Sequence, residues 1–217
     1  MKLGILGGTF DPIHLGHLRL AEEVGESFNL ERIYLIPAAS PPHKGGKEVS
    51  PFNHRFEMAR IAVEGSSLLD AFDLEGRRKG LSYSIETLKE FHQLYPSDLE
   101  LFFILGTDSF LEIETWRDYR DLFDYAHFVV IERPGILFGK TVVQLSSLGI
   151  SFKEKERGRF VSPSGHEVIF MKTTLMDISS TQIREKVAEG KSIRYLVPER
   201  VRCYILDNGL YKTHGLS

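Results

Sequence analysis

Two histidines near the start of the chain have the types and the spacing of a phosphate-binding pair. His14 and His17 lie in residues 7–17 (GGTFDPIHLGH), directly after a glycine-rich turn. Helix residues three apart share one face, so the spacing predicts both imidazoles on one face of a first helical turn, left open by Gly16 between them. The N–H groups and the dipole of a helix start attract an anion to the same place. We therefore expect a phosphate to bind there.

A second run of phosphate-binding type occurs far along the chain, at residues 178–184 (ISSTQIR). Serine and threonine hydroxyls at a helix start cap the helix and can also donate to phosphate oxygens, and Arg184 is placed to reach back over the same anion. Ser179 and Gln182 also satisfy an ordinary capping box, so the run by itself is compatible with a cap or a binding site. We expect the two helix starts to converge on one polyphosphate.

Competing chemistries lack their motifs. The first turn does not read G-x-G-x-x-G, and no G-x-x-x-x-G-K-[ST] run is present, which disfavours a dehydrogenase and a P-loop NTPase. A histidine pair could also be half of a metal site, but neither a cysteine partner nor an H-E-x-x-H pattern accompanies it. No protein metal ligands are expected.

The elements that must position these runs follow from the apolar pattern, which predicts strands alternating with helices. Nearly all-apolar runs expected to form strands lie at residues 3–6, 32–37, 68–73, 99–105, 127–132 and 167–172. Helical patterns lie at residues 15–28, 51–63, 82–94, 107–125 (in two pieces), 179–189 and 198–207. The expected N-caps are Ser50, Ser82 or Ser84, and Ser179 or Ser180, with Pro51 at a first helical position. Residues 145–165 show no clear period, and a loop or an insertion is expected there.

This alternation predicts an α/β fold with a Rossmann-like, doubly wound parallel sheet covered by helices on both faces. The 217 residues are expected to form a single domain with a small C-terminal helical part over about 178–217. Such sheets bind ligands beyond the carboxyl ends of their strands, which is where the run at residues 7–17 begins.

Composition and charge exclude several classes of protein. Apolar residues make up 42% and charged residues 26% of the sequence, which is typical of a globular protein. The net charge of −3 offers no general attraction to nucleic acid or to an anionic membrane. No run reaches the roughly 20 apolar residues of a membrane span, and no signal peptide is recognised. The one cysteine, Cys203, is expected to be a small core residue. We expect a cytoplasmic protein without nucleic-acid or membrane partners, and homo-oligomer formation is left open.

The run GTFDPIHLGH resembles the signature of the HxGH nucleotidyltransferases, and ISSTQIR resembles their second signature, ISSTxxR. The resemblance implies that His14 and His17 hold the phosphates of ATP and stabilise charge on a pentavalent transition state, with Arg184 beside the triphosphate. PPHK at residues 41–44 is similar to a segment of one branch of the superfamily and adds Lys44. Mg²⁺ is expected to accompany ATP without a dedicated protein cage. The remaining ATP-binding residues implied are Gly7, Gly8, Thr9, Phe10, Gly106, Asp108, Ile178, Ser179, Ser180 and Thr181.

Over almost the whole chain the resemblance is closest to the bacterial nicotinate-nucleotide adenylyltransferases, through the further segments GLSYSIETL, FILGTDSF, HFVVIERPG and YLVPERVRCYILDNGLY. It implies adenylyl transfer from ATP to nicotinate mononucleotide, giving deamido-NAD and pyrophosphate. Ser82, Tyr83 and Ser84 are then expected to bind the nicotinate carboxylate through main-chain N–H groups. Trp116 is expected to offer its ring to the pyridine. The orientation of Arg117, which follows it, is not predicted.

Other functions remain open from the sequence. A sister transferase would act on nicotinamide mononucleotide or on phosphopantetheine, although the SYS and PPHK segments and Trp116 disfavour the latter. A non-catalytic nucleotide sensor on the same fold would be expected to lack one of the histidines or Arg184, and all are present.

Overall fold

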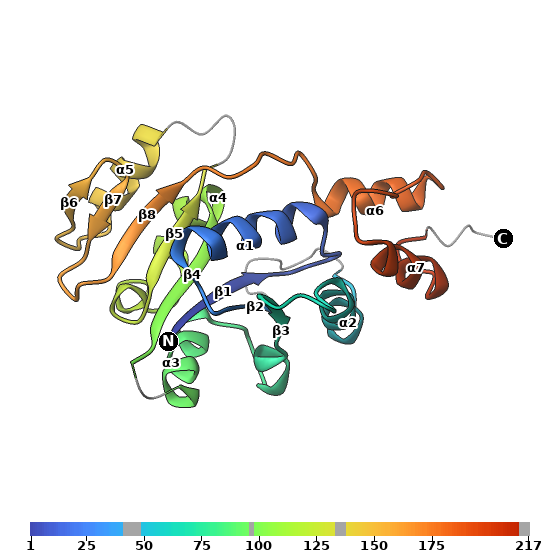
Figure 1. Ribbon diagram of the computed structural model, residues 1–217, viewed down its shortest axis with the longest axis horizontal. Coiled ribbons are helices and arrows are strands. Elements are labelled where there is room, and N and C mark those ends of the chain that lie inside the picture. Colours follow the sequence, from blue (N-terminus) through green and yellow to red (C-terminus); the bar gives the residue numbers. More distant parts are fainter. Residues whose placement is uncertain (41–48, 96–97, 133–137, 213–217) are drawn as a thin grey trace.

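The computed structural model describes residues 1–40, 49–95, 98–132 and 138–212, which fold around one mixed sheet (Figure 1). Its eight strands lie in the order β3-β2-β1-β4-β5-β8-β7-β6. The strand bounds are β1 Lys2–Gly8, β2 Arg32–Pro37, β3 Leu69–Ala71, β4 Glu100–Gly106, β5 His127–Ile131, β6 Lys153–Glu156, β7 Arg159–Val161 and β8 Glu167–Met171. The first six strands in sheet order pair in parallel, and β7 and β6 pair antiparallel. The predicted parallel sheet is confirmed in these six strands and carries an antiparallel edge that was not predicted.

Helices cover both faces of the sheet, as predicted. The α-helices are α1 Leu15–Phe28, α2 Phe52–Ala62, α3 Ser84–Leu94, α4 Thr107–Leu111, α5 Phe138–Ser147, α6 Ser180–Ala188 and α7 Glu199–Asp207. Short 3-10 helices lie at Leu74–Arg77, Ile113–Thr115 and Asp121–Asp124. The two helical pieces expected over residues 107–125 are therefore three shorter ones.

Alternate residues of the central strands enter two separate cores. Leu6 of β1 and Phe102 of β4 belong to the core that α1, α2, α6 and α7 cover. Ile5 and Phe103, their neighbours in sequence, belong to the core that α3, α4 and α5 cover. Because both faces are buried, these strands are apolar throughout instead of alternating with polar residues.

The C-terminal helices α6 and α7 join the first of these cores. Ile183 of α6 and Val201 of α7 are fully buried there with residues of β1 and α2. Figure 1 shows α7 beside α2 at the end of the sheet nearest the C-terminus. The His54 ring nitrogen Nδ1 and the Tyr204 hydroxyl, 2.9 Å apart, join these two helices. The C-terminal part is thus continuous in packing with the sheet.

The loop expected over residues 145–165 is wrong, and the alternative of an insertion stays a prediction. This stretch contains the end of α5 and an antiparallel hairpin, β6–β7, at the outer edge of the sheet. All four residues of β6 (KEKE) are exposed, so the strand has no apolar alternation to reveal it. Backbone pairing with β7 holds it in place, and charged side chains are a usual protection for an edge strand.

Several local expectations are corrected. Pro51 is the N-cap of α2 and not its first residue, and the Ser50 N–H donates to the Asp11 carboxylate at 3.1 Å. Tyr83 is the N-cap of α3, so neither Ser82 nor Ser84 caps that helix. The third strand is shorter than predicted because only Leu69–Ala71 pairs with β2.

Cys203 is exposed on α7, so the core position expected for it is wrong. It lies between the buried Val201 and Ile205, on the opposite side of the helix from both. Among the described residues, no helix combines the length and the apolar character needed to cross a membrane.

Candidate active site

Two cavities open at the carboxyl ends of β1 and β4, and they meet at His17. The first, of about 600 Å³, is lined by the turn after β1, the start of α3 and the chain around Trp116. The second, of about 720 Å³, is lined by His14, Gly16, Asp108 and residues 172–179. His17 contributes to the walls of both. A ligand in each cavity would therefore bring its near end to the same imidazole.

The two histidine rings stack on one another, as their spacing predicts. Their centroids lie 3.6 Å apart with an interplanar angle of 24°. His14 is the N-cap of α1 and not part of its first turn, which corrects the predicted position. A Cβ on Gly16 would lie 3.1 Å from His14 Nδ1, a tight contact that would press on this ring.

Backbone and ring contacts orient His17. The His14 N–H donates to His17 Nδ1 at 3.3 Å, and the edge of Phe10 packs against the ring with centroids 5.1 Å apart. Because Nδ1 accepts, the proton of the neutral ring lies on Nε2. The pair thus presents a fixed N–H donor at the junction of the two cavities.

The start of α6 reaches the turn after β1, so the two predicted motifs are in contact. Arg184 Nη1 donates to the Asp11 carbonyl at 2.6 Å, and the Ser180 hydroxyl donates to the Pro12 carbonyl at 2.8 Å. A second nitrogen of Arg184 lies 3.3 Å from the Thr181 hydroxyl. These bonds join residues about 170 positions apart in the sequence.

The capping box predicted at the start of α6 is present. Ser179 Oγ accepts from the Gln182 N–H, and Gln182 Oε1 accepts from the Ser179 N–H, both at 3.2 Å. Ile178 and Ser179 line the second cavity, and Ser180 lines the first. Among the described residues, Thr181 and Arg184 belong to neither wall and lie behind the turn.

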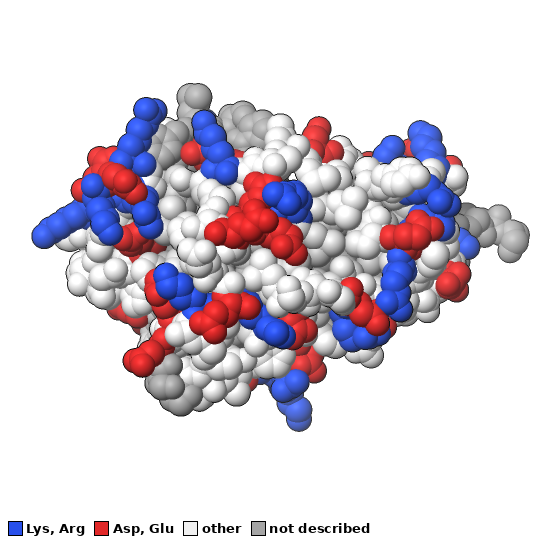
Figure 2. Space-filling model, in the orientation of Figure 1, with Lys and Arg blue, Asp and Glu red and all other residues white. Residues whose placement is uncertain are grey.

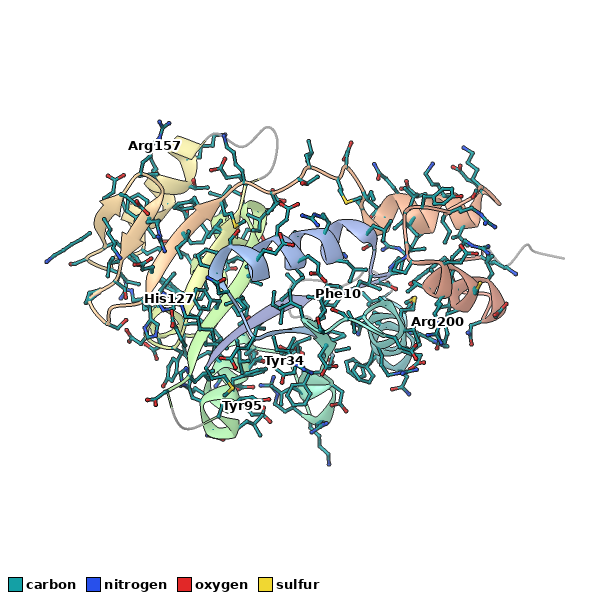
Figure 3. The ribbon with its side chains drawn as sticks, in the orientation of Figure 1. Phe10, Tyr34, Tyr95, His127, Arg157 and Arg200 are labelled. Atoms are coloured by element: carbon teal, nitrogen blue, oxygen red, sulfur yellow. The ribbon has the colours of Figure 1, made fainter. Side chains whose placement is uncertain are left out.

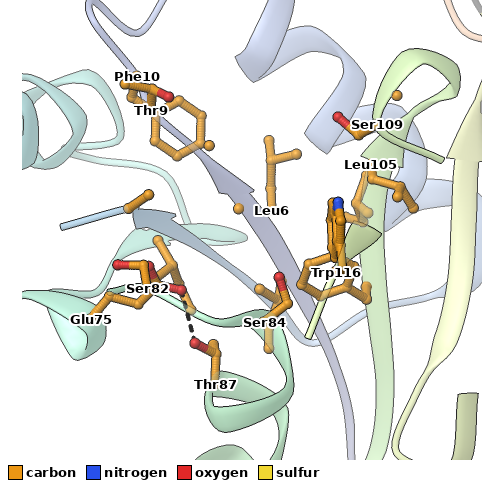
Figure 4. Close-up of a pocket in the computed structure, with 18 of the residues that line it drawn as sticks. Leu6, Thr9, Phe10, Glu75, Ser82, Ser84, Thr87, Leu105, Ser109 and Trp116 are labelled. Carbon is orange, nitrogen blue, oxygen red and sulfur yellow. Dashed lines mark hydrogen bonds between the residues drawn. The ribbon is translucent and has the colours of Figure 1, made fainter. Parts of the chain in front are cut away.

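The residues expected around the acceptor lie together in the first cavity. Figure 4 shows Trp116 and Ser109 on one side, facing Ser82 and Ser84 on the other, with the turn after β1 above them. Trp116 packs edge-on against Phe103, with centroids 6.1 Å apart. The ring is held by a core residue and also exposed to the cavity.

The Ser82 side chain has a structural use. Its hydroxyl accepts from the Ala39 N–H at 3.0 Å and from the Ser40 N–H at 3.2 Å, and its own N–H donates to the Ser40 carbonyl at 3.1 Å. Ser82 therefore joins the start of α3 to the chain after β2.

Arg117, whose orientation was not predicted from the sequence, also lines the first cavity. Its guanidinium lies 4.8 Å above the Tyr83 ring and pairs with Glu86 at 3.1 Å. Tyr83 is thereby covered by a cation at the mouth of the cavity.

The remaining predicted residues are placed as follows. Asp108 is an exposed residue in the first turn of α4 and lines the second cavity; Gly106, and not Asp108, is the N-cap. The first cavity is also lined by Gly7, Gly8, Thr9, Phe10 and Gly106. Lys44 lies outside the described residues. Across the described ranges, no group of three or more His, Cys, Asp or Glu side chains could hold a metal ion.

Arg55 and Asp11 are buried charged residues near the site that sequence reasoning missed. They are 2% and 4% exposed. Asp11 accepts from the Tyr211 hydroxyl at 2.7 Å, and burial beside this carboxylate raises the pKa of Tyr211. Desolvation lowers the pKa of Arg55, against the opposing effect of Asp11. The available signal for Arg55 was its position in the buried stripe of α2 with Met58 and Ala59.

Comparison with known proteins places this architecture in a family. Residues 5–186 match the family model described as cytidylyltransferase-like. A probable nicotinate-nucleotide adenylyltransferase of Geotalea daltonii is 44% identical over 97% of this chain and 98% of its own length. Another, of Syntrophotalea carbinolica, is 46% identical over the full length of both chains.

A solved structure shares the fold. The Plasmodium falciparum nicotinic acid mononucleotide adenylyltransferase complexed with NaAD superposes with a TM-score of 0.73 at 20% identity, over 97% of each chain. At this level of identity the likeness establishes the fold alone.

Proposed function

The chain belongs to the cytidylyltransferase-like family and, within it, to the nicotinate-nucleotide adenylyltransferases, and we propose that it transfers the adenylyl group of ATP to nicotinate mononucleotide. The products are nicotinate adenine dinucleotide (deamido-NAD) and pyrophosphate, so the reaction is a step of NAD biosynthesis. One observation carries the proposal. The stacked histidine pair lies where two cavities meet, one of a suitable size for each substrate.

The chemistry requires alignment and charge neutralisation. A phosphate oxygen of nicotinate mononucleotide attacks the α-phosphorus of ATP, a new P–O–P bond forms, and the bond from the α-phosphorus to the leaving pyrophosphate breaks. Because the attacking phosphate is already ionised at neutral pH, no general base is needed. His17, with its proton on Nε2, supplies a donor to the oxygens of the transferring phosphorus, and His14 supports it by stacking. One such preorganised donor is worth on the order of 10²–10³ in rate.

We assign the second cavity, with Asp108, Ile178 and Ser179, to ATP. The turn of Gly7, Gly8, Thr9 and Phe10, together with Gly106 and Ser180, is proposed to face the phosphates from the first cavity. Arg184 holds this turn through the Asp11 carbonyl, Thr181 is proposed to support Arg184 through its hydroxyl, and Lys44 completes the proposed phosphate-binding set.

The start of α3 and Trp116 are proposed to bind the acceptor. Tyr83 and Ser84 would present main-chain N–H groups to the nicotinate carboxylate, and Ser82, whose own N–H donates to the Ser40 carbonyl, would hold this segment in place beside them. The engagement of the Ser82 hydroxyl by Ala39 and Ser40 supports main-chain recognition, since that side chain is already used. Trp116 would place its ring against the pyridine, because it lines the same cavity.

A divalent metal accompanies ATP in nucleotidyltransferases, and we propose Mg²⁺. Across the described ranges no cluster of carboxylate, imidazole and thiol ligands could hold it, so its ligands would be phosphate oxygens and water, as Mg²⁺ prefers. Asp108, Glu132 and Asp177 are carboxylate residues that line the second cavity. When bound, the ion supplies positive charge to the pyrophosphate that leaves.

The charge on the surface and the packing of the core support the proposals on partners, localisation and domain organisation. Positive and negative side chains are interspersed over the face seen in Figure 2, and the net charge is −3, which favours small nucleotides over nucleic acid as partners. We propose a cytoplasmic enzyme. The shared core of the sheet, α6 and α7 supports a single domain, and homo-oligomer formation needs a direct measurement.

A direct assay tests the function. The protein is incubated with ATP, Mg²⁺ and nicotinate mononucleotide, and the products are identified by mass spectrometry and by pyrophosphate release. Nicotinamide mononucleotide and phosphopantetheine are offered in parallel. We expect dinucleotide from nicotinate mononucleotide at the highest kcat/KM. A higher kcat/KM with either of the other acceptors would overturn the substrate assignment, and ATP binding without pyrophosphate release from any acceptor would support a sensor.

A further inference from the structure

Arg55 is a fully buried cation whose partners are main-chain carbonyls. It lies on α2, is 2% exposed, and makes four hydrogen bonds. Its guanidinium donates to the carbonyls of Ser50 (2.8 Å), Thr9 (2.9 Å), Ala38 (2.7 Å) and Ala39 (3.2 Å). Buried arginines are usually paired with a carboxylate. A guanidinium that instead donates all of its hydrogen bonds to four carbonyls indicates a specific structural role.

The nearest buried carboxylate is engaged elsewhere. The two oxygens of Asp11 accept from the Ser50 N–H and from the Tyr211 hydroxyl. The attraction between Asp11 and Arg55 acts through space and offsets part of the cost of burying the guanidinium. Arg55 and Asp11 together therefore hold Ser50 by its carbonyl and by its N–H.

The four carbonyls belong to three segments that are far apart in sequence. Thr9 is in the turn after β1, Ala38 and Ala39 follow β2, and Ser50 precedes α2. Thr9 and Ala38 both line the first cavity. The β1–β2 pairing and the bond from the Ala38 N–H to the Gly8 carbonyl (2.8 Å) also join these segments, and Arg55 adds a side-chain link between the turn beside the histidine pair and the neighbouring wall of the cavity.

Arg55 is also one of three side chains from remote segments that bind carbonyls of the turn after β1. The carbonyls of Thr9, Asp11 and Pro12 each accept from a side chain of a remote segment, the first from Arg55 and the others from Arg184 and Ser180. Carbonyl oxygens carry partial negative charge and repel phosphate. Two guanidinium groups bound to them offset that charge and turn the carbonyls toward the protein.

We propose that Arg55 is a positioning residue for adenylyl transfer, one that holds the Thr9 turn and the Ala38–Ala39 wall in the arrangement that the reacting phosphates need. This inference rests on the proposed function. Displacement of a reacting group by about 1 Å can cost on the order of 10²-fold in rate. Loss of Arg55 is therefore expected to lower kcat beyond any effect on stability.

Two substitutions separate positioning from stability. Arg55→Met removes the charge and all four bonds but fills similar volume. Because it leaves four carbonyls without this donor, some loss of stability is expected as well, and the unfolding measurement separates that loss from the effect on kcat. Arg55→Lys keeps the charge but cannot span three segments at once, because an ammonium is a point charge. We expect both to fold, with kcat lowered about 10-fold or more for Lys and further for Met. Arg60→Lys, an exposed arginine on the same helix paired with Glu57, is the matched control and should keep the wild-type kcat.

A pH profile supplies a readout that a stability role would not move. A buried lysine loses its proton at lower pH than an exposed one, so the kcat of Arg55→Lys should fall as the pH rises through that pKa. The titratable groups that face position 55 are Asp11, Glu75 and Tyr211. The two carboxylates favour the protonated lysine, and Tyr211, whose pKa is raised, is neutral over this pH range. The wild type and Arg60→Lys should show no such additional fall.

The measurements are kcat and KM for both substrates from pH 6 to 10 and thermal unfolding by circular dichroism. Wild-type kcat in folded Arg55→Met, or the absence of the additional pH dependence in Arg55→Lys, would overturn the inference while leaving the proposed function intact. Failure of both variants to fold would also overturn it, because Arg55 would then be a stability residue. If the wild type itself forms no dinucleotide, the proposed function fails, and the inference with it.

Discussion

The carboxyl ends of β1 and β4 and the β6–β7 edge of the same sheet are held in place by different kinds of contact. At the carboxyl ends, the buried Arg55 of α2 and the partly buried Arg184 of α6 bind carbonyls of the turn after β1, across up to 173 positions of sequence. At the edge, the hairpin is held by pairing between neighbouring strands and by exposed ion pairs such as that of Lys155 and Glu167, 2.9 Å apart. The first region is specified by remote contacts and the second by local ones. Substitutions should therefore affect catalysis in the first region and have small effects in the second.

The largest difference is expected for His17→Ala. We expect kcat to fall by at least about 10²-fold, because an oxyanion donor of this kind is worth that much, while the fold is retained. The control is His166→Gln, in the edge region, which should keep kcat within about twofold. Steady-state kinetics of dinucleotide formation measure both. Near-wild-type turnover of His17→Ala would contradict the catalytic role proposed for His17 and the difference between the two regions.

Arg184→Ala should have the next largest effect. Removing the guanidinium frees the Asp11 carbonyl, which lies next to the phosphate site, and we expect kcat/KM for ATP to fall about 10-fold or more, as for loss of one charge-assisted hydrogen bond. Arg159→Ala, which breaks exposed pairs with Glu156 and Glu167 at the edge, is the control. Equal kinetics for the two variants would show that remote bonding at the turn has no catalytic value.

The amino-terminal side of the sheet offers a pH-dependent contrast. His127, far from Phe10 in Figure 3, stacks on Phe102 with its centroid 5.1 Å from that of His166. Desolvation lowers the pKa of both histidines. The unfolded chain then binds more protons than the folded chain below about pH 6.5, so stability should fall as the pH falls from 6.5 through the lowered pKa values.

Thermal unfolding between pH 5 and 8 measures this effect. The Tm should decrease toward acid pH, and His166→Gln should flatten the decrease by removing one of the two titrating groups. Groups that also act on this pair are Glu100, Glu167, Lys2, His92 and Asp124. A Tm that is the same for both proteins at every pH would contradict the prediction.

The smallest effect is expected for Lys155→Ala at the edge. This lysine is 60% exposed, and exposed ion pairs contribute little. We expect the free energy of unfolding to change by about 0.5 kcal/mol or less and kcat to remain at the wild-type value. Urea denaturation and the dinucleotide assay measure the two quantities. A large loss in either would mean that the edge is coupled to the site.

Prediction from the sequence succeeded where the signal was local. The bounds of β2 and α1 match the predicted ones, because a short apolar run and a repeat at helical spacing are each complete within their own segment. The capping box of Ser179 and Gln182 was readable for the same reason. The motifs at residues 7–17 and 178–184 were identified, and their contact through Arg184 and Ser180 is present.

Prediction failed where a residue's environment is supplied by distant chain. The exposed β6 was missed for a different, local reason: it has no apolar pattern of its own, and its partner β7 is the next strand in the chain. Cys203 sits in an apolar run, but the face it occupies on α7 is turned away from the core. Ser82 was expected as a helix cap, yet its hydroxyl binds Ala39 and Ser40, 43 and 42 positions away.

The sequence by itself determined the order of the six parallel strands along the chain, the two-sided burial of the central strands, and the presence of the paired histidines and the second motif, since each depends on residue types within a few positions. Only the tertiary structure decided that the histidine rings lie at the junction of two cavities, that Arg184 holds the Asp11 carbonyl, and that Arg55 joins three segments. The physical reason is that a buried charge is placed by the bonds that compensate for its loss of water. Those partners come from parts of the chain that meet only after folding.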